Sequence, residues 1–123
     1  MIHGQDFYNP IDKELYIVQG DTLSFNFQIA GLAGAEPSFI MTCINHFNDA
    51  DALFTATSED GEISQIDYDA EKDTYTYSLR VPPAKTKGLD LARLYYDLKL
   101  LVNSDTITLM RGKINILYQV GKG

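Results

Sequence analysis

The chain has 123 residues, of which 45% are hydrophobic and 22% are charged. This length and composition are typical of one globular domain that buries its own core, and they exclude a disordered chain. The formal net charge is −7, and the ten Lys and Arg residues are scattered, so no nucleic-acid partner is expected.

No apolar run approaches the roughly 18 residues that span a bilayer, so no membrane partner is expected either. The N-terminus lacks the basic start and apolar stretch of a secretory signal. We therefore expect synthesis and folding in a cytoplasm, with export only inside a larger particle that lysis releases.

The predicted elements begin after an irregular arm, residues 1–13, which Asn9-Pro10 interrupts. The domain itself is expected over residues 14–120, and residues 121–123 form a short tail. Residues 84–91 alone have helical leanings, enough for a single turn. Strands are expected at residues 15–19, 22–29, 38–47, 52–57, 62–67, 74–81, 94–102 and 106–120.

Several of these strands alternate cleanly between apolar and polar residues. Residues 22–29 place Leu23, Phe25, Phe27 and Ile29 on one face, and residues 74–81 behave likewise, as expected for strands buried on one face. Residues 38–47 carry apolar side chains of both parities, which indicates burial on both faces or a partner that covers one.

The closing hairpin, residues 94–120, has a polar turn at residues 103–105. Its second strand changes phase, because Ile107 and Leu109 share one parity while Ile114 and Ile116 share the other. An extra residue is needed for such a change, and Gly112 is the expected bulge.

Short strands with turn signals every 8–12 residues predict an all-β antiparallel β-sandwich of about seven or eight strands, with a small barrel as the alternative. The segment from Asp90 to Tyr96 resembles the approach to a strand of immunoglobulin-type sandwiches, where a tyrosine hydroxyl bonds back to the backbone across a corner. Asp90, Tyr96 and Gly112 are therefore the expected structural residues. The cysteine of antibody domains is absent, since Leu98 stands in its place.

Four segments carry a wider resemblance, in this order: Gly20-Asp21-Thr22-Leu23-Ser24-Phe25, the corner from Val81 to Leu89, Tyr95-Tyr96-Asp97-Leu98, and the strand from Leu109 to Ile116. Together they resemble the immunoglobulin-like N-terminal domain of phage baseplate upper proteins and small prophage tail structural proteins.

The resemblance implies a non-enzymatic virion structural protein, a tail or baseplate docking module. Its expected partners are other tail and baseplate proteins, or further copies of itself in a homo-oligomer. Its expected location is the phage tail, after synthesis in the bacterial cytoplasm. Family members often continue into a fibre or a receptor-binding region, whereas this chain ends soon after its last strand, so docking is the expected role.

The sequence contains little evidence for a catalytic site. Cys43, the single cysteine, lies among apolar residues, so a small buried hydrophobe is favoured over a nucleophile. His46 lies near Asp49 and Asp51, but the only other histidine is His3, so a zinc site is disfavoured. No nucleophile elbow or phosphate-binding loop is present. We expect no enzyme activity and no cofactor.

The alternative function is a carbohydrate- or Ca²⁺-dependent ligand-binding sandwich. The acidic cluster Asp67, Asp69 and Asp73 supplies oxygen ligands for such an ion, although it fails the EF-hand pattern. A solvated turn is the favoured interpretation. With no Trp for sugar stacking, the surface aromatic residues favour protein contacts, and those expected at the surface are Tyr8, Tyr16, Tyr68, Tyr95 and Tyr118.

Overall fold

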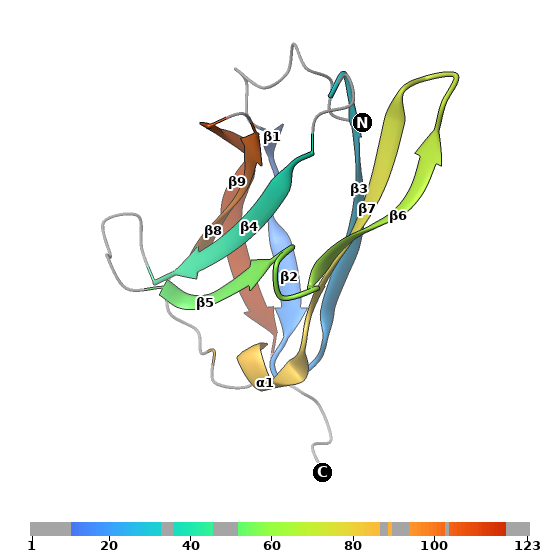
Figure 1. Ribbon diagram of the computed structural model, residues 1–123. Coiled ribbons are helices and arrows are strands. Elements are labelled where there is room, and N and C mark those ends of the chain that lie inside the picture. The colour runs from blue at the N-terminus through green and yellow to red at the C-terminus, as the bar shows by residue number, and fades with distance from the viewer. Residues whose placement is uncertain are drawn as a thin grey trace.

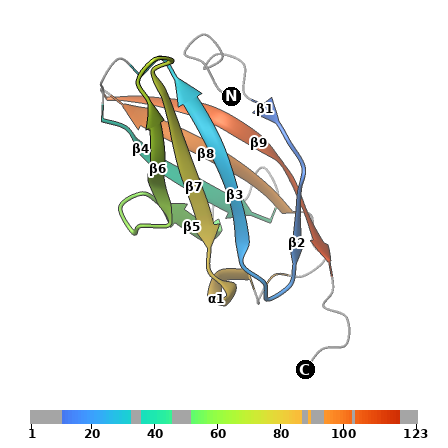
Figure 2. The same ribbon diagram turned by 90° about the vertical axis from the view of Figure 1, so that its right-hand side faces the viewer.

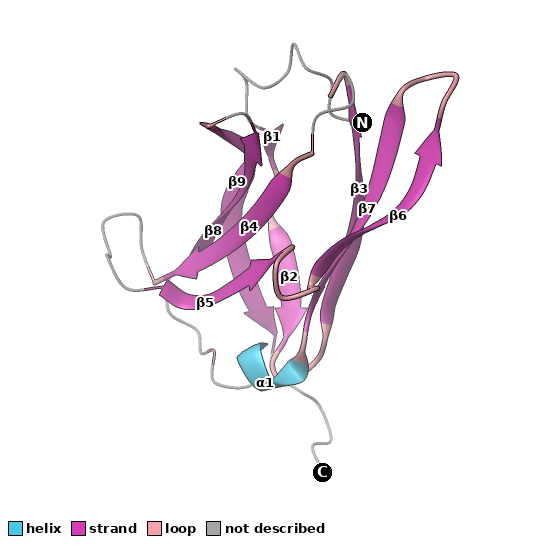
Figure 3. Ribbon diagram, viewed as in Figure 1, coloured by secondary structure: helices cyan, strands magenta, loops and turns pink. Residues whose placement is uncertain are grey.

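The computed structural model describes residues 11–32, 36–45, 52–86, 89, 94–102 and 104–117. Within them the chain forms nine strands and one short helix, α1 (Pro83–Thr86). Figure 3 shows how completely strands dominate the molecule. The all-β expectation is confirmed.

The strands form two separate sheets packed face to face (Figures 1 and 2). The six-stranded sheet has the order β1 (Ile11–Asp12), β9 (Asp105–Leu117), β8 (Leu94–Val102), β4 (Ser38–Ile44) and β5 (Ala52–Thr57), and β2 (Leu15–Val18) also pairs with β9. The three-stranded sheet has the order β3 (Leu23–Ala30), β7 (Thr74–Val81) and β6 (Ile63–Asp69). Two open sheets confirm the sandwich and rule out the barrel.

The end of the predicted arm differs from the expectation. Ile11 and Asp12 form β1, so they belong to the sheet and raise the number of described strands to nine. β1 and β2 both run parallel to β9, whereas the remaining strand pairs are antiparallel. The earlier part of the arm, residues 1–10, lies outside the described residues.

Alternating side chains from both sheets build the core. In β8 the side chains of Tyr96, Leu98 and Leu100 are at most 2% exposed, while Tyr95 and the other residues between them are half-buried or exposed. Inward residues of β3 and β7 meet them from the opposite sheet. The period of two therefore places the core correctly in these strands.

Aromatic rings pack across the space between the two sheets. The Phe39 ring of β4 lies 5.4 Å from the Phe27 ring of β3 and 4.5 Å from the Tyr77 ring of β7, centroid to centroid. Phe27 and Tyr77 also stack on each other at 5.6 Å. Such pairs add about 0.5–1.5 kcal/mol each beyond their area burial.

The predicted bulge exists, but Gly112 is not its position. Leu98 of β8 faces Met110 of β9 while Lys99 faces Thr108, so Leu109 is the extra residue. Leu109 and Met110 are consequently buried in succession. The phase change is therefore complete before the chain reaches Gly112.

Gly112 has another role. A Cβ atom at Gly112 would lie 2.3 Å from the carbonyl oxygen of Lys13, because the chain between β1 and β2 crosses directly over it. Lys13 also donates its backbone N–H to the carbonyl of Arg111, at 2.9 Å. Only glycine leaves room for this crossing.

Helix α1 ties the two sheets together at one end of the sandwich. The Thr86 hydroxyl, which is fully buried, donates to the carbonyl of Asp21 at 2.6 Å. Lys85 pairs with Glu62 at 2.7 Å and donates to the carbonyl of Thr55 in β5, at 2.6 Å.

Candidate functional site

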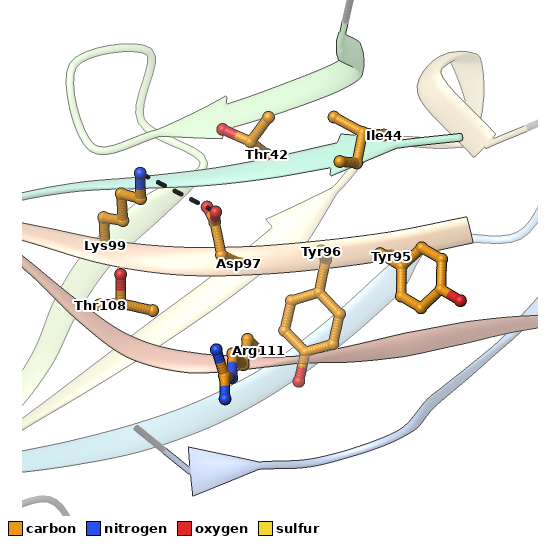
Figure 4. Close-up of a pocket in the computed structure, with 8 residues that line it drawn as sticks. All are labelled: Thr42, Ile44, Tyr95, Tyr96, Asp97, Lys99, Thr108 and Arg111. Atoms are coloured by element: carbon orange, nitrogen blue, oxygen red, sulfur yellow. Dashed lines mark ion pairs between the residues drawn. The ribbon is translucent and has the colours of Figure 1, made fainter. Parts of the chain in front are cut away.

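A shallow hollow marks the outer face of the six-stranded sheet, the side away from the core (Figure 4). Its volume is about 250 Å³. β4 contributes Thr42 and Ile44, and β8 and β9 contribute the remaining side chains. The complete lining is Thr42, Ile44, Tyr95, Tyr96, Asp97, Lys99, Thr108 and Arg111. We call the outward-facing side chains among them, all except Tyr96, the β8 face.

Strand register brings this set together. Asp97 stands at the centre of the sheet, directly opposite Thr42 of β4 on one side and Arg111 of β9 on the other. Lys99 in turn pairs with Thr108. Because alternate residues of a strand share a face, Tyr95, Asp97 and Lys99 form a row along β8.

Asp97 is the least satisfied charged group of the β8 face. Its Oδ2 lies 3.9 Å from the Lys99 ammonium, and Figure 4 shows these two side chains directed toward each other. Its Oδ1 is buried, with no hydrogen-bond partner among the described residues. Burial raises the pKa of the Asp97 carboxyl, and the Lys99 charge partly opposes this rise.

The arginine opposite Asp97 is already engaged elsewhere. Arg111 Nε donates to Asp12 Oδ1 of β1 at 3.2 Å. Asp97 therefore depends on Lys99 for its countercharge. The β8 face therefore combines charges of both signs, the apolar side chain of Ile44 and a carboxylate oxygen without a hydrogen-bond donor among the described residues. Protein interfaces combine apolar and polar contacts in this way.

Tyr96 makes a long-range bond that differs from the predicted corner. Its hydroxyl donates to the carbonyl of Lys13 at 2.7 Å, so it fastens the β1–β2 junction to β8. Burial raises the pKa of this hydroxyl, and the Asp12 carboxylate adds to the rise. Asp90, the other member of the expected corner, lies outside the described residues.

The acidic cluster lies on the β6–β7 hairpin, where its carboxylates accept hydrogen bonds from other residues of the hairpin. Asp69 Oδ1 accepts from the backbone N–H of Glu71 at 3.1 Å, and Asp73 Oδ1 accepts from the Tyr68 hydroxyl at 3.3 Å. Across the part of the chain that the structure describes, no three acidic, histidine or cysteine residues gather as a metal site would require. The placement of Asp67, Asp69 and Asp73 therefore gives no support to the Ca²⁺ alternative.

Cys43 is a core residue, as favoured from the sequence. Its side chain is fully buried on the inner face of β4, and burial raises the pKa of the thiol to about 12. A thiol in this state is not a nucleophile at neutral pH. His3 and His46 lie outside the described residues.

The structure describes three of the five tyrosines expected at the surface. Tyr16 is 64% exposed and Tyr68 is 43% exposed, while Tyr95 is half-buried in the hollow. Tyr8 and Tyr118 lie outside the described residues. Asp97 was not among the site residues predicted from the sequence, since a carboxylate on the outward face of an alternating strand looks like an ordinary surface residue.

Within the described residues, no helix has the length and apolar character needed to span a membrane.

No family model matches the chain, and no curated protein matches it. Among solved structures, it is similar to the NK cell receptor Nkp44, a triggering partner in natural cytotoxicity, at 14% identity and a TM-score of 0.50. That match covers 88% of this chain and 98% of the receptor chain. A structure of voltage-gated sodium channel beta subunits matches 86% of this chain and 92% of its own, at 10% identity and a TM-score of 0.45.

The strand order and the Nkp44 match define the class of fold. The chain is an immunoglobulin-like β-sandwich, in which β5 extends the β9-β8-β4 sheet as an additional strand does in variable-type domains. At these identities the likeness concerns the fold alone.

Proposed function

We propose that this chain is a non-enzymatic docking module and that the β8 face is its contact surface. The observation that carries the proposal is Asp97, held half-buried at the centre of a hollow with one oxygen unpaired. Because this oxygen is buried, the Asp97 side chain would turn outward to meet a hydrogen-bond donor of a partner that also covers Ile44. A buried polar group that gains its missing bond contributes about 1–3 kcal/mol to the stability of the complex.

Non-enzymatic action is supported by what the described residues offer. Cys43 is buried and protonated, and the charged groups of the β8 face consist of one carboxylate and two cations, without a nucleophile beside a base. Such a surface is suited to recognition.

The partner class in the proposal is a phage tail or baseplate protein, and the chain would then be a virion structural protein. The ordered set of segments that resembles the N-terminal domain of baseplate upper proteins supports this assignment. Two of these segments meet in the site, since Tyr95 to Leu98 supply Tyr95 and Asp97, and Leu109 to Ile116 supply Arg111.

The test is direct binding of the full chain to purified tail and baseplate proteins encoded beside its gene, measured by calorimetry. Thr108→Arg and Lys99→Glu alter the β8 face, while Ser64→Arg alters an exposed position on the opposite sheet. We expect binding to weaken about tenfold or more, or about 1.4 kcal/mol, in the first two variants and to stay unchanged in the third.

Equal binding by all three variants would overturn the contact surface. Absence of binding to any of these proteins would overturn the tail assignment. Heat on titration with CaCl₂ or with a glycan panel would instead favour the alternative, a carbohydrate- or Ca²⁺-dependent module.

A further inference from the structure

The two edges of the three-stranded sheet differ in how they are protected. β6, at one edge, carries Asp67 and Asp69 and is interrupted by a bulge at Ile66. Charges and bulges of this kind are the usual means of preventing an edge strand from pairing with another chain. The β6 edge is therefore protected against pairing with another chain.

β3, at the other edge, has none of these protections. Its eight residues contain no charge, proline or glycine, and they pair with β7 without any register shift. On its other side β3 has no strand partner among the described residues. Every second residue of β3 therefore directs its N–H and C=O outward, unpaired by a strand.

A groove of about 620 Å³ runs beside this edge, between β3 and β1. Its apolar lining includes Ile11, Phe25 and Met110, of which Ile11 is 37% exposed and Phe25 is half-buried. The groove places incompletely covered apolar surface next to unpaired backbone, the combination that favours strand addition.

The charge of the chain limits what could occupy this edge. Each copy carries a net charge of −7, so two copies repel each other, and the repulsion is least where the surfaces in contact carry no charge. β3 provides such a surface along its full length. It is also self-complementary: antiparallel pairing about Asn26 sets Ser24 against Gln28, and Phe25 against Phe27, so polar residues face polar ones and aromatic residues face aromatic ones.

From this we infer that a second copy of the chain docks at β3. The two β3 strands pair antiparallel about a two-fold axis at Asn26, and the two three-stranded sheets become one continuous sheet of six. The interface is isologous, as in most homodimers. It is independent of the β8 face, so it holds whether or not the proposed function does.

The first test is sedimentation velocity of the full chain from about 1 µM to about 1 mM, a range that covers weak dimers. We expect a monomer–dimer equilibrium. Asn26→Lys places two like charges opposite each other and should raise the dissociation constant about tenfold or more. Ser64→Lys makes the same charge change on the protected β6 edge and should leave it unchanged.

The second test fixes the register. Directly opposite Cα atoms in an antiparallel pair lie about 4.5–5.5 Å apart, within reach of a disulfide. Asn26→Cys chains should therefore cross-link to each other on oxidation, whereas Ser24→Cys chains should cross-link only with Gln28→Cys chains. Cys43 is fully buried and does not compete.

A monomer at every concentration would overturn the inference. This result would be expected if residues 1–10 of the same chain cover β3, or if only a strand of another protein binds there. A dimer that Lys99→Glu disrupts and Asn26→Lys does not would overturn it as well, since it would place the interface on the β8 face. Circular dichroism melts of each variant test whether the substitution leaves the fold intact.

Discussion

Gly112 shows how one missing side chain determines where the N-terminal segment lies. The carbonyl of Lys13 rests over Gly112 and accepts the hydroxyl of Tyr96. The same few atoms thus hold β1 and β2 against β9. This contact is local in space but spans most of the sequence.

Gly112→Ala should destabilise the fold. The added methyl group would meet backbone atoms of Lys13, which cannot turn aside as a flexible side chain would, so the crossing must move. We expect a loss of about 1–3 kcal/mol in the free energy of unfolding, measured by urea denaturation. Lys113→Ala, at the exposed neighbouring position, should change it by less than about 0.5 kcal/mol, and an equal loss in both variants would contradict the crossing.

Asp97 should make stability depend on pH in a defined direction. Its folded-state pKa is raised, so the native state holds the proton more tightly than the unfolded state does. The contribution of Asp97 to stability is therefore favourable at low pH and is lost as pH rises from the unfolded pKa through the folded pKa. Asp97→Asn removes this dependence.

The measurement is the free energy of unfolding of the wild type and Asp97→Asn at about pH 3 and about pH 7. We expect the variant to gain relative to the wild type at the higher pH. Thr106→Ala, an uncharged change in the same hairpin, should leave the difference between the two pH values as in the wild type. A difference that Asp97→Asn does not alter would show that the carboxyl is not penalised by burial.

At the level of elements, α1 connects the two sheets through side-chain hydrogen bonds and an ion pair. Its Lys85 reaches the end of β5 and the residue that precedes β6, and its Thr86 reaches the β2–β3 turn. Glu62, the partner of Lys85, keeps only 14% of its side chain exposed. This short helix therefore contributes more than its length suggests.

Two ion pairs of the chain should differ in how much they contribute to the free energy of unfolding. Lys85→Ala removes the cation from the largely buried Glu62 carboxylate, which keeps only the Thr57 N–H as a donor, and the donor from the Thr55 carbonyl, so we expect a loss of about 1–3 kcal/mol in unfolding free energy. Arg111→Ala breaks the exposed pair with Asp12, whose side chains are 56% and 77% exposed, and should cost less than about 1 kcal/mol. Thermal melts at low and high salt measure both, and the reverse order would contradict the role of α1.

At the level of the whole molecule, the core holds the two sheets together without a disulfide. Phe27, Phe39 and Tyr77 span the space between the sheets, and Cys43 lies fully buried on the inner face of β4. The one thiol is thus a reporter of global opening rather than a reactive group.

Cys43 should resist thiol reagents at about pH 8 until the protein unfolds, because burial blocks access and raises the thiol pKa to about 12. The rate of alkylation, followed by mass spectrometry across a urea series, should rise together with the unfolded fraction. Rapid labelling of the native protein would contradict the buried placement. A Ser64→Cys variant supplies an exposed control thiol on β6, which should react at once.

The alternation of apolar and polar residues predicted most of this fold. The bounds of the strands at residues 52–57, 74–81 and 94–102, and the inward faces of β3, β7 and β8, follow from period-two patterning. Such patterns are local, and burial on one face of a strand is decided by the sequence within it. The solvated turn around Asp69 and the buried state of Cys43 follow for the same reason.

Tertiary structure alone decided the remaining features, because each depends on residues far apart in the chain. Whether Leu109 or Gly112 is the extra residue of β9 depends on which residues of β8 stand opposite, and the room needed over Gly112 depends on Lys13. The parallel pairing of β1 and β2, the hollow around Asp97 and the open edge of β3 likewise appear only once the strands are ordered in sheets. Sequence determined which faces are buried, and the order of the strands decided which surfaces remain free for a partner.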